Sequence, residues 1–237
     1  MKPIDKKRRS NTPIIVAGVL VICALAALAF VPLIYGLVSG GTGVRTEGIE
    51  EAKLKQATTP IDGTWEVSGK PGANLSSAGF SFHEILPGEE KITSGSTRDV
   101  SGTVEISAGV LRAGEIVVDV TNLTTDSDRR DTNVRNKILH TDTYPEAVFA
   151  VTQEVDVSQL PEDGSVGQVE LTGEMTIHGV TQPVTHTFDV VRSGENVIVA
   201  GDVPINREDY GVQTPDFVAA KIDKQGEVNI RLKFEKK

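Results

Sequence analysis

Residues 169–190 constrain the fold more than any other part of the chain. Residues 169–177 alternate apolar and polar side chains with a period of two, which is typical of a β-strand with one buried face. The alternation resumes at Val184, after a predicted turn over residues 178–183, with Pro183 at the expected start of the second strand. This pattern predicts an antiparallel hairpin whose turn is longer than the tight two-residue kind.

Other segments with the same period predict the rest of a sheet. These segments are residues 62–67, 79–83, 100–108, 115–120, 147–157, 196–202 and 227–234. Short turns join several of them, which favours an up-and-down meander. Residues 85–99 contain Pro87, Gly88, Gly95 and many charges, so we expect an exposed, mobile loop there.

Residues 123–145 interrupt the strand pattern. They lack alternation, but Thr125 or Asp126 provides a helix start, and Val134 and Ile138 lie one helical turn apart. We therefore expect a short helical cap across one end of a barrel. The predicted fold is all-β: an extended eight-stranded antiparallel barrel with this cap, closed so that no sheet edge is exposed.

The interior of such a barrel is either filled by side chains or holds one small ligand. Aromatic residues make up only 5% of the chain, and the inward positions are mostly medium-sized apolar side chains. Gly173 and Gly201 fall in phase with them, so we expect space for an apolar ligand. A packed core is the alternative, and the pattern leaves both open.

Residues 14–38 contain no charge and follow the basic residues Lys6, Lys7, Arg8 and Arg9. A membrane helix needs about 20 apolar residues, and positive flanks stay in the cytoplasm. We expect a single-pass anchor with everything after it outside the cytoplasm. A cleaved signal peptide is the alternative, although this apolar run is longer than the usual signal core.

The chain thus divides into four parts. These are a basic cytoplasmic N-terminus at residues 1–13, a transmembrane helix at 14–38, a linker at 39–60 and the barrel at 61–237. The linker combines glycines with a charged run and has little apolar surface, so it is expected to act as a tether.

Charge and residue types exclude several functions. The formal net charge is −9 despite the basic N-terminus, so the barrel is not expected to bind nucleic acid. Cys23, the single cysteine, lies in the apolar run. The histidines His83, His140, His178 and His186 are scattered without metal-ligand spacing, so no metal site is expected.

Two histidines and two charged clusters are the remaining polar candidates. His186 falls on the inward face, where its partner is a ligand headgroup or a buried side chain. His178 precedes a glycine and is expected to fix the turn or to bond a loop. Residues 130–131 and 207–209 are expected to form ion pairs that fasten a cap to the rim. The sequence has no nucleophile elbow and no phosphate-binding loop, so neither catalysis nor a cofactor is expected.

Six stretches, taken in order, resemble the YceI-like family of lipocalin-like bacterial proteins that bind polyisoprenoid lipids. They are Thr64-Trp-Glu-Val67, Gly79-Phe-Ser-Phe82, residues 124–126 with Arg130-Asp131, Tyr144-Pro-Glu-Ala-Val-Phe149, Gly173-Glu-Met-Thr-Ile-His-Gly-Val-Thr181 with Pro183, and Asn206-Arg-Glu-Asp-Tyr-Gly211. The resemblance covers residue 60 onward. It implies an extended barrel whose tunnel takes a long isoprenoid chain. One departure is His83-Glu84 with a longer acidic loop, which predicts a different tunnel mouth there.

From this resemblance and the inward phase, we expect seventeen residues to line the tunnel. They are Trp65, Phe80, Phe82, Val104, Ile106, Val118, Val120, Ile138, Phe149, Leu171, Met175, Ile177, His186, Phe188, Val199, Ile230 and Leu232.

The expected function is that of a membrane-anchored, extracytoplasmic binding protein for an isoprenoid lipid such as a quinone or a polyprenol. The alternatives are an envelope interaction module with a filled barrel and, third, an enzyme acting on an isoprenoid. The sequence leaves the oligomeric state open, with a homodimer among the alternatives.

Overall fold

The computed structural model describes residues 44–86, 89–214 and 221–237. The predicted transmembrane helix at residues 14–38 lies outside these residues. Within the described ranges, no helix is both long and apolar enough to cross a bilayer.

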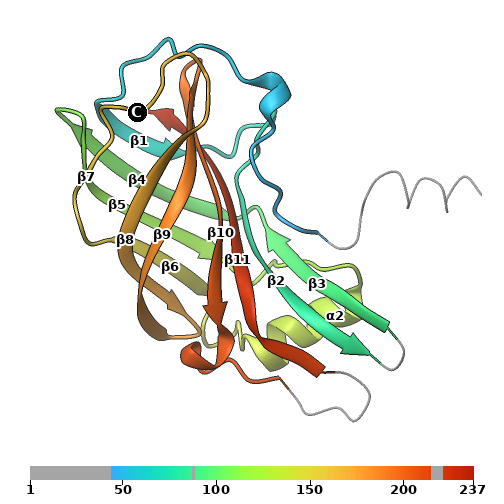
Figure 1. The fold of residues 1–237 in the computed structure, drawn as a ribbon. Helices are drawn as coiled ribbons and strands as arrows, with labels where there is room; N and C mark the ends of the chain where they lie inside the picture. The colour runs from blue at the N-terminus through green and yellow to red at the C-terminus, as the bar shows by residue number, and fades with distance from the viewer. Residues whose placement is uncertain (1–43, 87–88, 215–220) are drawn as a thin grey trace, which may run out of the picture. The chain divides into compact units, whose positions relative to one another are not determined.

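Eleven strands and four short helical segments make up the described fold (Figure 1). In chain order they are η1 (Glu51–Lys53), β1 (Gly63–Val67), β2 (Ser77–Leu86), β3 (Glu89–Thr97), β4 (Val100–Ser107), β5 (Val110–Asp119), α2 (Asp128–Asn133), η2 (Val134–Ile138), β6 (Glu146–Val151), β7 (Val155–Asp156), β8 (Gly167–Ile177), β9 (Val180–Ser193), β10 (Asn196–Asn206), η3 (Arg207–Tyr210) and β11 (Lys221–Lys236).

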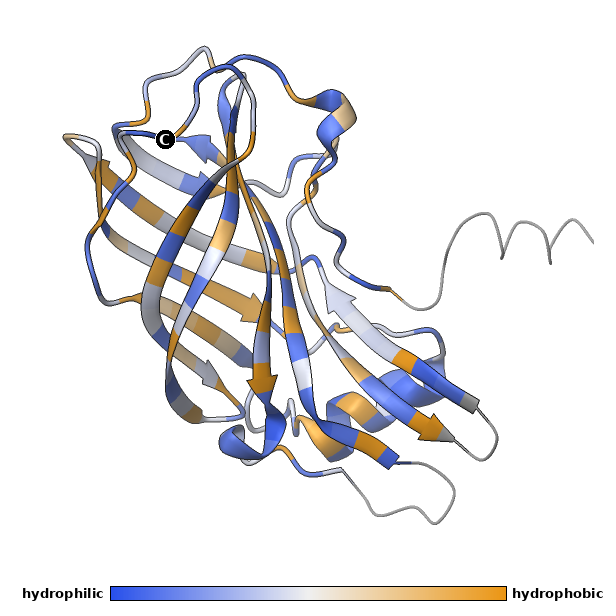
Figure 2. Cartoon of the chain, in the orientation of Figure 1, coloured by the Kyte–Doolittle hydropathy of each residue, from blue (hydrophilic) through white to orange (hydrophobic). Residues whose placement is uncertain are grey.

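The strands form a closed antiparallel barrel. The order β1-β4-β5-β6-β8-β9-β10-β11 returns to its start because β11 pairs with β1, with Trp65 opposite Lys236. The prediction of an all-β, eight-stranded antiparallel barrel with one short helix is confirmed. Apolar and polar residues alternate along β8 and β9, visible as orange and blue bands in Figure 2, because successive side chains point to opposite faces of a strand.

The expectation of a mobile loop over residues 85–99 was wrong. These residues form the end of β2 and the whole of β3, which pair from Ala78↔Thr97 to Leu86↔Glu89. The polar side chains of Thr93, Ser94 and Ser96 are buried. Hydrogen bonds satisfy this part of the sheet, since Thr93 donates to Glu84 and the Ser96 backbone pairs with Thr124. Because the buried side chains of β3 are polar and hydrogen-bonded, its sequence does not alternate between apolar and polar residues.

The β2–β3 hairpin also interrupts the predicted meander. β1 lies between β4 and β11 rather than beside β2, and β2 pairs with the first part of β11. The long strand β11 therefore takes both β1 and β2 on the same edge, one after the other along its length.

The turn between β8 and β9 is tighter than predicted. It contains two residues, His178 and Gly179, with Ile177 opposite Val180. Both turn residues have positive φ, 52° and 73°, as a tight hairpin turn of the mirror-image kind requires. Pro183 is within β9, opposite Glu174, on a stretch where no register with β10 exists among the described strands. An edge position of this kind tolerates the missing proline N–H.

The barrel wall has a seam between β9 and β10. Their register runs from Ser193↔Asn196 to Asp189↔Ala200. Past that point β9 continues along β8, while β10 continues along β11.

The predicted helical excursion is present, although it begins later than expected. Ser127 is the N-cap of α2, and its side chain accepts a hydrogen bond from the Arg130 backbone N–H. The following turn is a wider π-type segment that carries Val134 and Ile138. In Figure 1, α2 lies at the lower end of the barrel, near β2 and β3.

The described part of the linker contacts the barrel. The Arg231 guanidinium donates to the Gly48 carbonyl at 3.1 Å, and the Lys55 N–H donates to the Ser193 hydroxyl at 3.0 Å. Thr46 is buried. From Val44 onward, the predicted tether is therefore held against the domain by hydrogen bonds.

Candidate functional site: two adjoining chambers in the barrel

The barrel encloses two adjoining cavities. The first, here called the upper chamber, has a volume of about 150 Å³ and is lined by apolar residues from β1, β4–β6 and β8–β11. The second, the lower chamber, has a volume of about 270 Å³ and is bordered by β2, α2, η2 and η3. Both chambers are lined by Ala78, Val118, Ala147, Ile177 and Val228, so these five residues mark the boundary between them.

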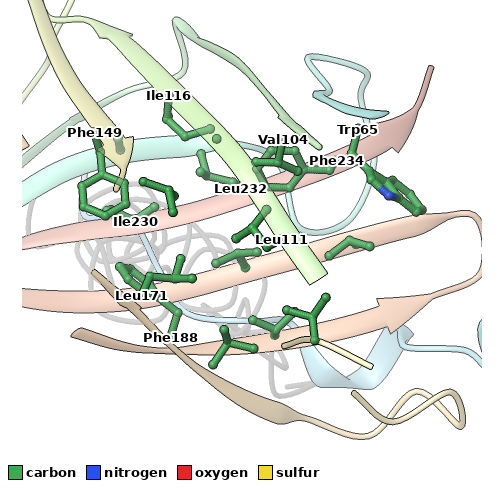
Figure 3. A pocket seen from close by; sticks show the side chains of 18 of the residues that line it. Trp65, Val104, Leu111, Ile116, Phe149, Leu171, Phe188, Ile230, Leu232 and Phe234 are labelled. Carbon is green, nitrogen blue, oxygen red and sulfur yellow. The ribbon is translucent and has the colours of Figure 1, made fainter. Parts of the chain in front are cut away.

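The upper chamber is closed at one end by Trp65. This side chain is 2% exposed, and its indole N–H donates to the Ile61 carbonyl at 2.7 Å. Because its single polar group is satisfied, the tryptophan presents only apolar surface to the cavity. Figure 3 shows Trp65 beside Phe234 at one end of the chamber, with Phe149, Leu171 and Phe188 toward the other end.

Gly173 and Gly201 do not create this space, contrary to the sequence-based expectation. A Cβ atom on Gly173 would lie 2.7 Å from the Phe149 ring and 2.4 Å from the Ala150 carbonyl oxygen. A Cβ on Gly201 would lie 2.7 Å from the Phe188 ring. The phenyl rings cover these two glycines, and neither glycine lines a chamber.

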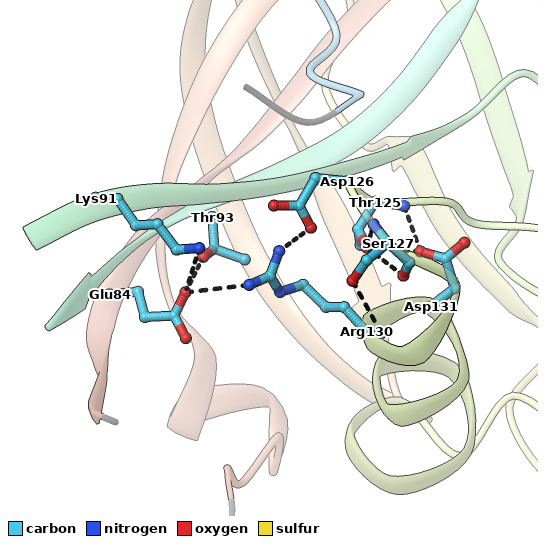
Figure 4. A network of polar contacts seen from close by, with 8 residues as sticks. All are labelled: Glu84, Lys91, Thr93, Thr125, Asp126, Ser127, Arg130 and Asp131. Carbon is cyan, nitrogen blue, oxygen red and sulfur yellow. Dashed lines mark hydrogen bonds and ion pairs between the residues drawn. The ribbon is translucent and has the colours of Figure 1, made fainter. Parts of the chain in front are cut away.

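A polar network fastens α2 to the sheet beside the lower chamber (Figure 4). The Glu84 carboxylate on β2 accepts a hydrogen bond from Thr93 and lies 3.6 Å from the Arg130 guanidinium. Arg130 also pairs with Asp126, and Lys91 lies 3.8 Å from Glu84. The prediction that Arg130 fastens the cap through ion pairs is confirmed.

Asp131, unlike Arg130, is bonded to Thr125 and not to a charged side chain. Its carboxylate accepts hydrogen bonds from both the backbone N–H and the hydroxyl of Thr125, each at 2.6 Å. Asp131 therefore fixes the chain at the start of α2.

The expectation of ion pairs at residues 207–209 was only partly right. Arg207 is buried, and its guanidinium donates to the backbone carbonyls of Val212, Ile222 and Asp223 at 2.8, 3.4 and 3.2 Å. It therefore ties η3 to β11 through the backbone. The ion pair of this segment is formed by Glu208 with Lys224, at 2.8 Å.

Aromatic residues cluster around the β8–β9 turn, where Tyr144, His178 and Tyr210 line the lower chamber. The His178 ring lies 4.5 Å from the Tyr144 ring and 5.6 Å from the His140 ring, measured between centroids. Tyr210 on η3 is 3% exposed. Burial raises the pKa of the Tyr210 phenol, and the charge of Asp209 adds to the shift. Tyr210 is therefore a neutral group at physiological pH.

The structure places sixteen of the seventeen predicted lining residues on the chamber walls. Those of the upper chamber are Trp65, Val104, Ile106, Phe149, Leu171, Met175, Phe188, Val199, Ile230 and Leu232. Those of the lower chamber are Phe80, Phe82, Val120 and Ile138, while Val118 and Ile177 line both. Contact of these residues with a ligand stays a prediction.

His186 lines neither chamber. It lies on β9 at the seam, where its ring contacts Phe188 edge-on at 5.0 Å and its Nε2 is 3.4 Å from the Cβ position of Gly201. The His186 ring thus lies against Phe188 and Gly201, next to the point where β9 and β10 diverge, and not on a chamber wall.

Sequence reasoning missed the polar wall of the lower chamber. This wall is lined by Glu84, Thr93, Arg130, Tyr144 and Arg207, which are not apolar residues of an alternating strand pattern. They lie on loops, helices and the β2–β3 hairpin, and the available signal for Arg130, Tyr144 and Arg207 was their position in the family-like stretches. Within residues 44–86, 89–214 and 221–237, no cluster of three His, Cys, Asp or Glu residues is placed to hold a metal ion.

Comparison with known proteins gives several relatives. The UPF0312 protein of Vibrio parahaemolyticus is 33% identical over 82 residues, which are 34% of this chain and 40% of that protein. The YceI protein of Shigella flexneri is 28% identical over 105 residues, 43% of this chain and 51% of the relative. The chain spans about half the length of the curated relatives it matches.

Two solved structures share the fold. The polyisoprenoid binding domain from Saccharophagus degradans superposes with a TM-score of 0.53 at 19% identity, covering 69% of this chain and 99% of that one. The BcnA protein of Burkholderia cenocepacia also gives a TM-score of 0.53, at 20% identity, covering 67% and 94%. The model of the YceI-like domain matches residues 72–234, so the chain belongs to the YceI-like family.

Proposed function

We propose that this protein binds a long-chain isoprenoid lipid, a quinone or a polyprenol, inside its barrel. The observation that carries this proposal is the pair of adjoining chambers, of about 150 and 270 Å³, the upper one lined entirely by apolar residues. An apolar cavity of about 150 Å³, such as the upper chamber, stays free of water, so an apolar ligand enters it without displacing bound solvent. The role is binding, for carriage or storage, without catalysis.

The family supports an isoprenoid over other apolar ligands. A structural neighbour in the same fold is a polyisoprenoid binding domain. An isoprenoid tail is a linear, flexible hydrocarbon, and the two chambers adjoin each other inside the barrel. A tail that passes the boundary formed by Val118, Ala147 and Ile177 would occupy both.

The proposed location is the outer face of the cytoplasmic membrane. It rests on the uncharged residues 14–38 and the basic cluster before them. An anchor of this kind would hold the barrel next to the bilayer that contains its ligand. A reporter fused after Lys237 should then be active only outside the cytoplasm, and cytoplasmic activity would contradict the proposal.

Lipid extraction tests the binding function. The full chain is purified from its native host, extracted with organic solvent, and the extract is analysed by mass spectrometry. We expect an isoprenoid in stoichiometric amount. A clean extract from folded protein would favour the interaction module with an empty or filled barrel.

A matched pair of variants assigns the lipid to the chambers. Ala147→Phe places a phenyl ring at the boundary between them and should abolish lipid recovery. Ala150→Phe makes the same change on the same strand, opposite Glu115 and Glu174 on the outer face, and should keep the lipid. Equal recovery from both variants would place the lipid elsewhere.

A further inference from the structure

The two chambers differ in polarity, and this difference orients an amphiphilic ligand. The upper chamber offers no side-chain hydrogen-bonding group, since the indole N–H of Trp65 is already bonded to Ile61. The lower chamber is bordered by Arg130, Tyr144 and His178. Burying a polar group without a partner is unfavourable, so the oxygen-bearing end of an isoprenoid belongs in the lower chamber.

Most polar side chains of the lower chamber already have partners. Glu84, Thr93 and Arg130 bond one another or Asp126, and the Arg207 guanidinium donates to three carbonyls. His178 differs. Its Nε2 atom is buried, and no described residue forms a hydrogen bond with it. Buried polar atoms in folded proteins nearly always have a partner.

The β8–β9 turn does not itself need an imidazole. His178 has φ of 52° and Gly179 has φ of 73°, and Asn-Gly is the sequence that forms such a turn most readily. The imidazole ring is held in place by Tyr144, whose ring leaves no room for a Cβ atom on Gly179. The position thus carries a fixed ring with a free nitrogen at the edge of the chamber.

We infer that the Nε2–H of His178 donates a hydrogen bond to an oxygen at the polar end of the bound isoprenoid, such as a quinone carbonyl, with the tail in the upper chamber. A neutral imidazole carries one N–H and so supplies this donor without a buried charge. The inference rests on the proposed isoprenoid binding and deepens it by assigning the orientation and the group that recognises the head.

Two probes separate recognition of the head from binding of the tail. A short-chain ubiquinone carries carbonyl oxygens, whereas squalene is an isoprenoid hydrocarbon without oxygen. His178→Asn removes Nε2 and keeps a residue that suits the turn. The control is His140→Asn, because His140 also has positive φ, 48°, but is exposed and lines neither chamber.

We expect His178→Asn to weaken ubiquinone binding roughly tenfold, the effect of one hydrogen bond, and to leave squalene binding unchanged. His140→Asn should change neither. An equal loss for both probes, or no loss for ubiquinone, would overturn the role of His178 while isoprenoid binding stands. If the unaltered protein binds neither probe, the proposed function itself fails, and the inference fails with it.

A second measurement does not depend on the variant. In protein labelled with ¹⁵N-histidine, the Nε2 resonance of His178 should shift on adding ubiquinone and stay in place on adding squalene. The same shift with both probes would show that the nitrogen responds to filling of the cavity and not to an oxygen.

Discussion

The upper and lower chambers are neighbours, yet they are built from different kinds of structure. Strands surround the upper chamber, and their inward side chains are apolar without exception. The lower chamber is enclosed partly by α2, η2, η3 and loops, which bring charged and aromatic groups to its wall. Regular strands provide a uniform apolar surface, whereas the irregular segments provide groups that distinguish one ligand from another.

The difference follows from backbone geometry. A strand presents every second residue to the interior, so a simple alternation keeps one face apolar. A short helix or turn presents residues at uneven spacing, and each needs its own hydrogen bonds. The upper chamber should therefore respond to changes in side-chain volume, and the wall of the lower chamber to changes in polar contacts.

The largest effect on stability is expected from Gly173→Leu in the upper wall. The new side chain would meet the Ala150 carbonyl and the Phe149 ring, because no free space exists above this glycine. Overpacking of this kind costs about 1–3 kcal/mol in the free energy of unfolding. Urea denaturation measures it.

Gly69→Leu is the matched control for that variant. No atom lies within 4 Å of a Cβ built on Gly69, so its free energy of unfolding should stay close to that of the unaltered protein. If Gly173→Leu were equally stable, the phenyl ring over Gly173 would have to move without cost, and the strand wall would not be sensitive to side-chain volume as expected.

A smaller effect is expected in the lower wall from Glu84→Gln. The side chain of Glu84 is 10% exposed and joins β2 to Thr93 and Arg130. Losing its charge should cost about 1 kcal/mol, since hydrogen bonds to buried charged groups are stronger than neutral ones. Thermal unfolding with amide exchange at α2 would show both the cost and its location.

An exposed ion pair provides the comparison for Glu84. The carboxylate of Glu154 pairs with Arg112 on the surface, where their side chains are 57% and 41% exposed. Glu154→Gln should change stability by less than about 0.5 kcal/mol. Equal effects from the two variants would mean that the network at α2 contributes no more than a surface contact.

The smallest effect is expected at the outer surface near the end of β11. Hydrogen bonds from Lys70 and Ser68 hold the pKa of Glu235 below its ordinary value of 4.5. A carboxylate with a lowered pKa contributes stability above the pKa of the unfolded chain, and this contribution is lost as the pH falls through the folded pKa. Because Lys70 is largely exposed, the contribution is a few tenths of a kcal/mol.

Unfolding measured as a function of pH isolates that contribution. Glu235→Gln should lower stability slightly at neutral pH and match the unaltered protein in acid, below the folded pKa. A constant difference at every pH would show that the glutamate acts through packing and not through its charge.

The regular part of the molecule was predictable because its signal repeats. The alternation at residues 169–177 gave β8, and the inward phase of β11 gave Ile230 and Leu232 on the chamber wall. The β2–β3 hairpin was not predictable, because its buried residues Thr93 and Ser96 are polar, and their bonds to Glu84 and to the Thr124 backbone leave no apolar alternation in the sequence.

The other differences between the predictions and the structure arise from residues that are distant in sequence but close in space. An inward glycine indicates space only if no ring lies over it, and the Phe149 ring over Gly173 comes from a different strand. His186 has the correct phase for the interior, but its ring lies against Phe188 beside the point where β9 and β10 diverge, and it lines neither chamber. The sequence predicted His178 as a turn residue, whereas the absence of a hydrogen-bond partner for its buried Nε2 among the described residues can be recognised only in the structure.

The pairing of β11 has a consequence for the order of folding. This strand pairs with β10, which immediately precedes η3, but also with β1 and β2 near the start of the barrel sequence. During synthesis a chain emerges N-terminus first, and contacts between residues distant in sequence form slowly. The barrel therefore cannot close until residues 221–236 have emerged, and until then β1 and β2 are paired on one side only, with β4 and β3. A nascent chain of this protein must therefore keep its apolar interior strands from associating with other chains until β11 has been synthesised.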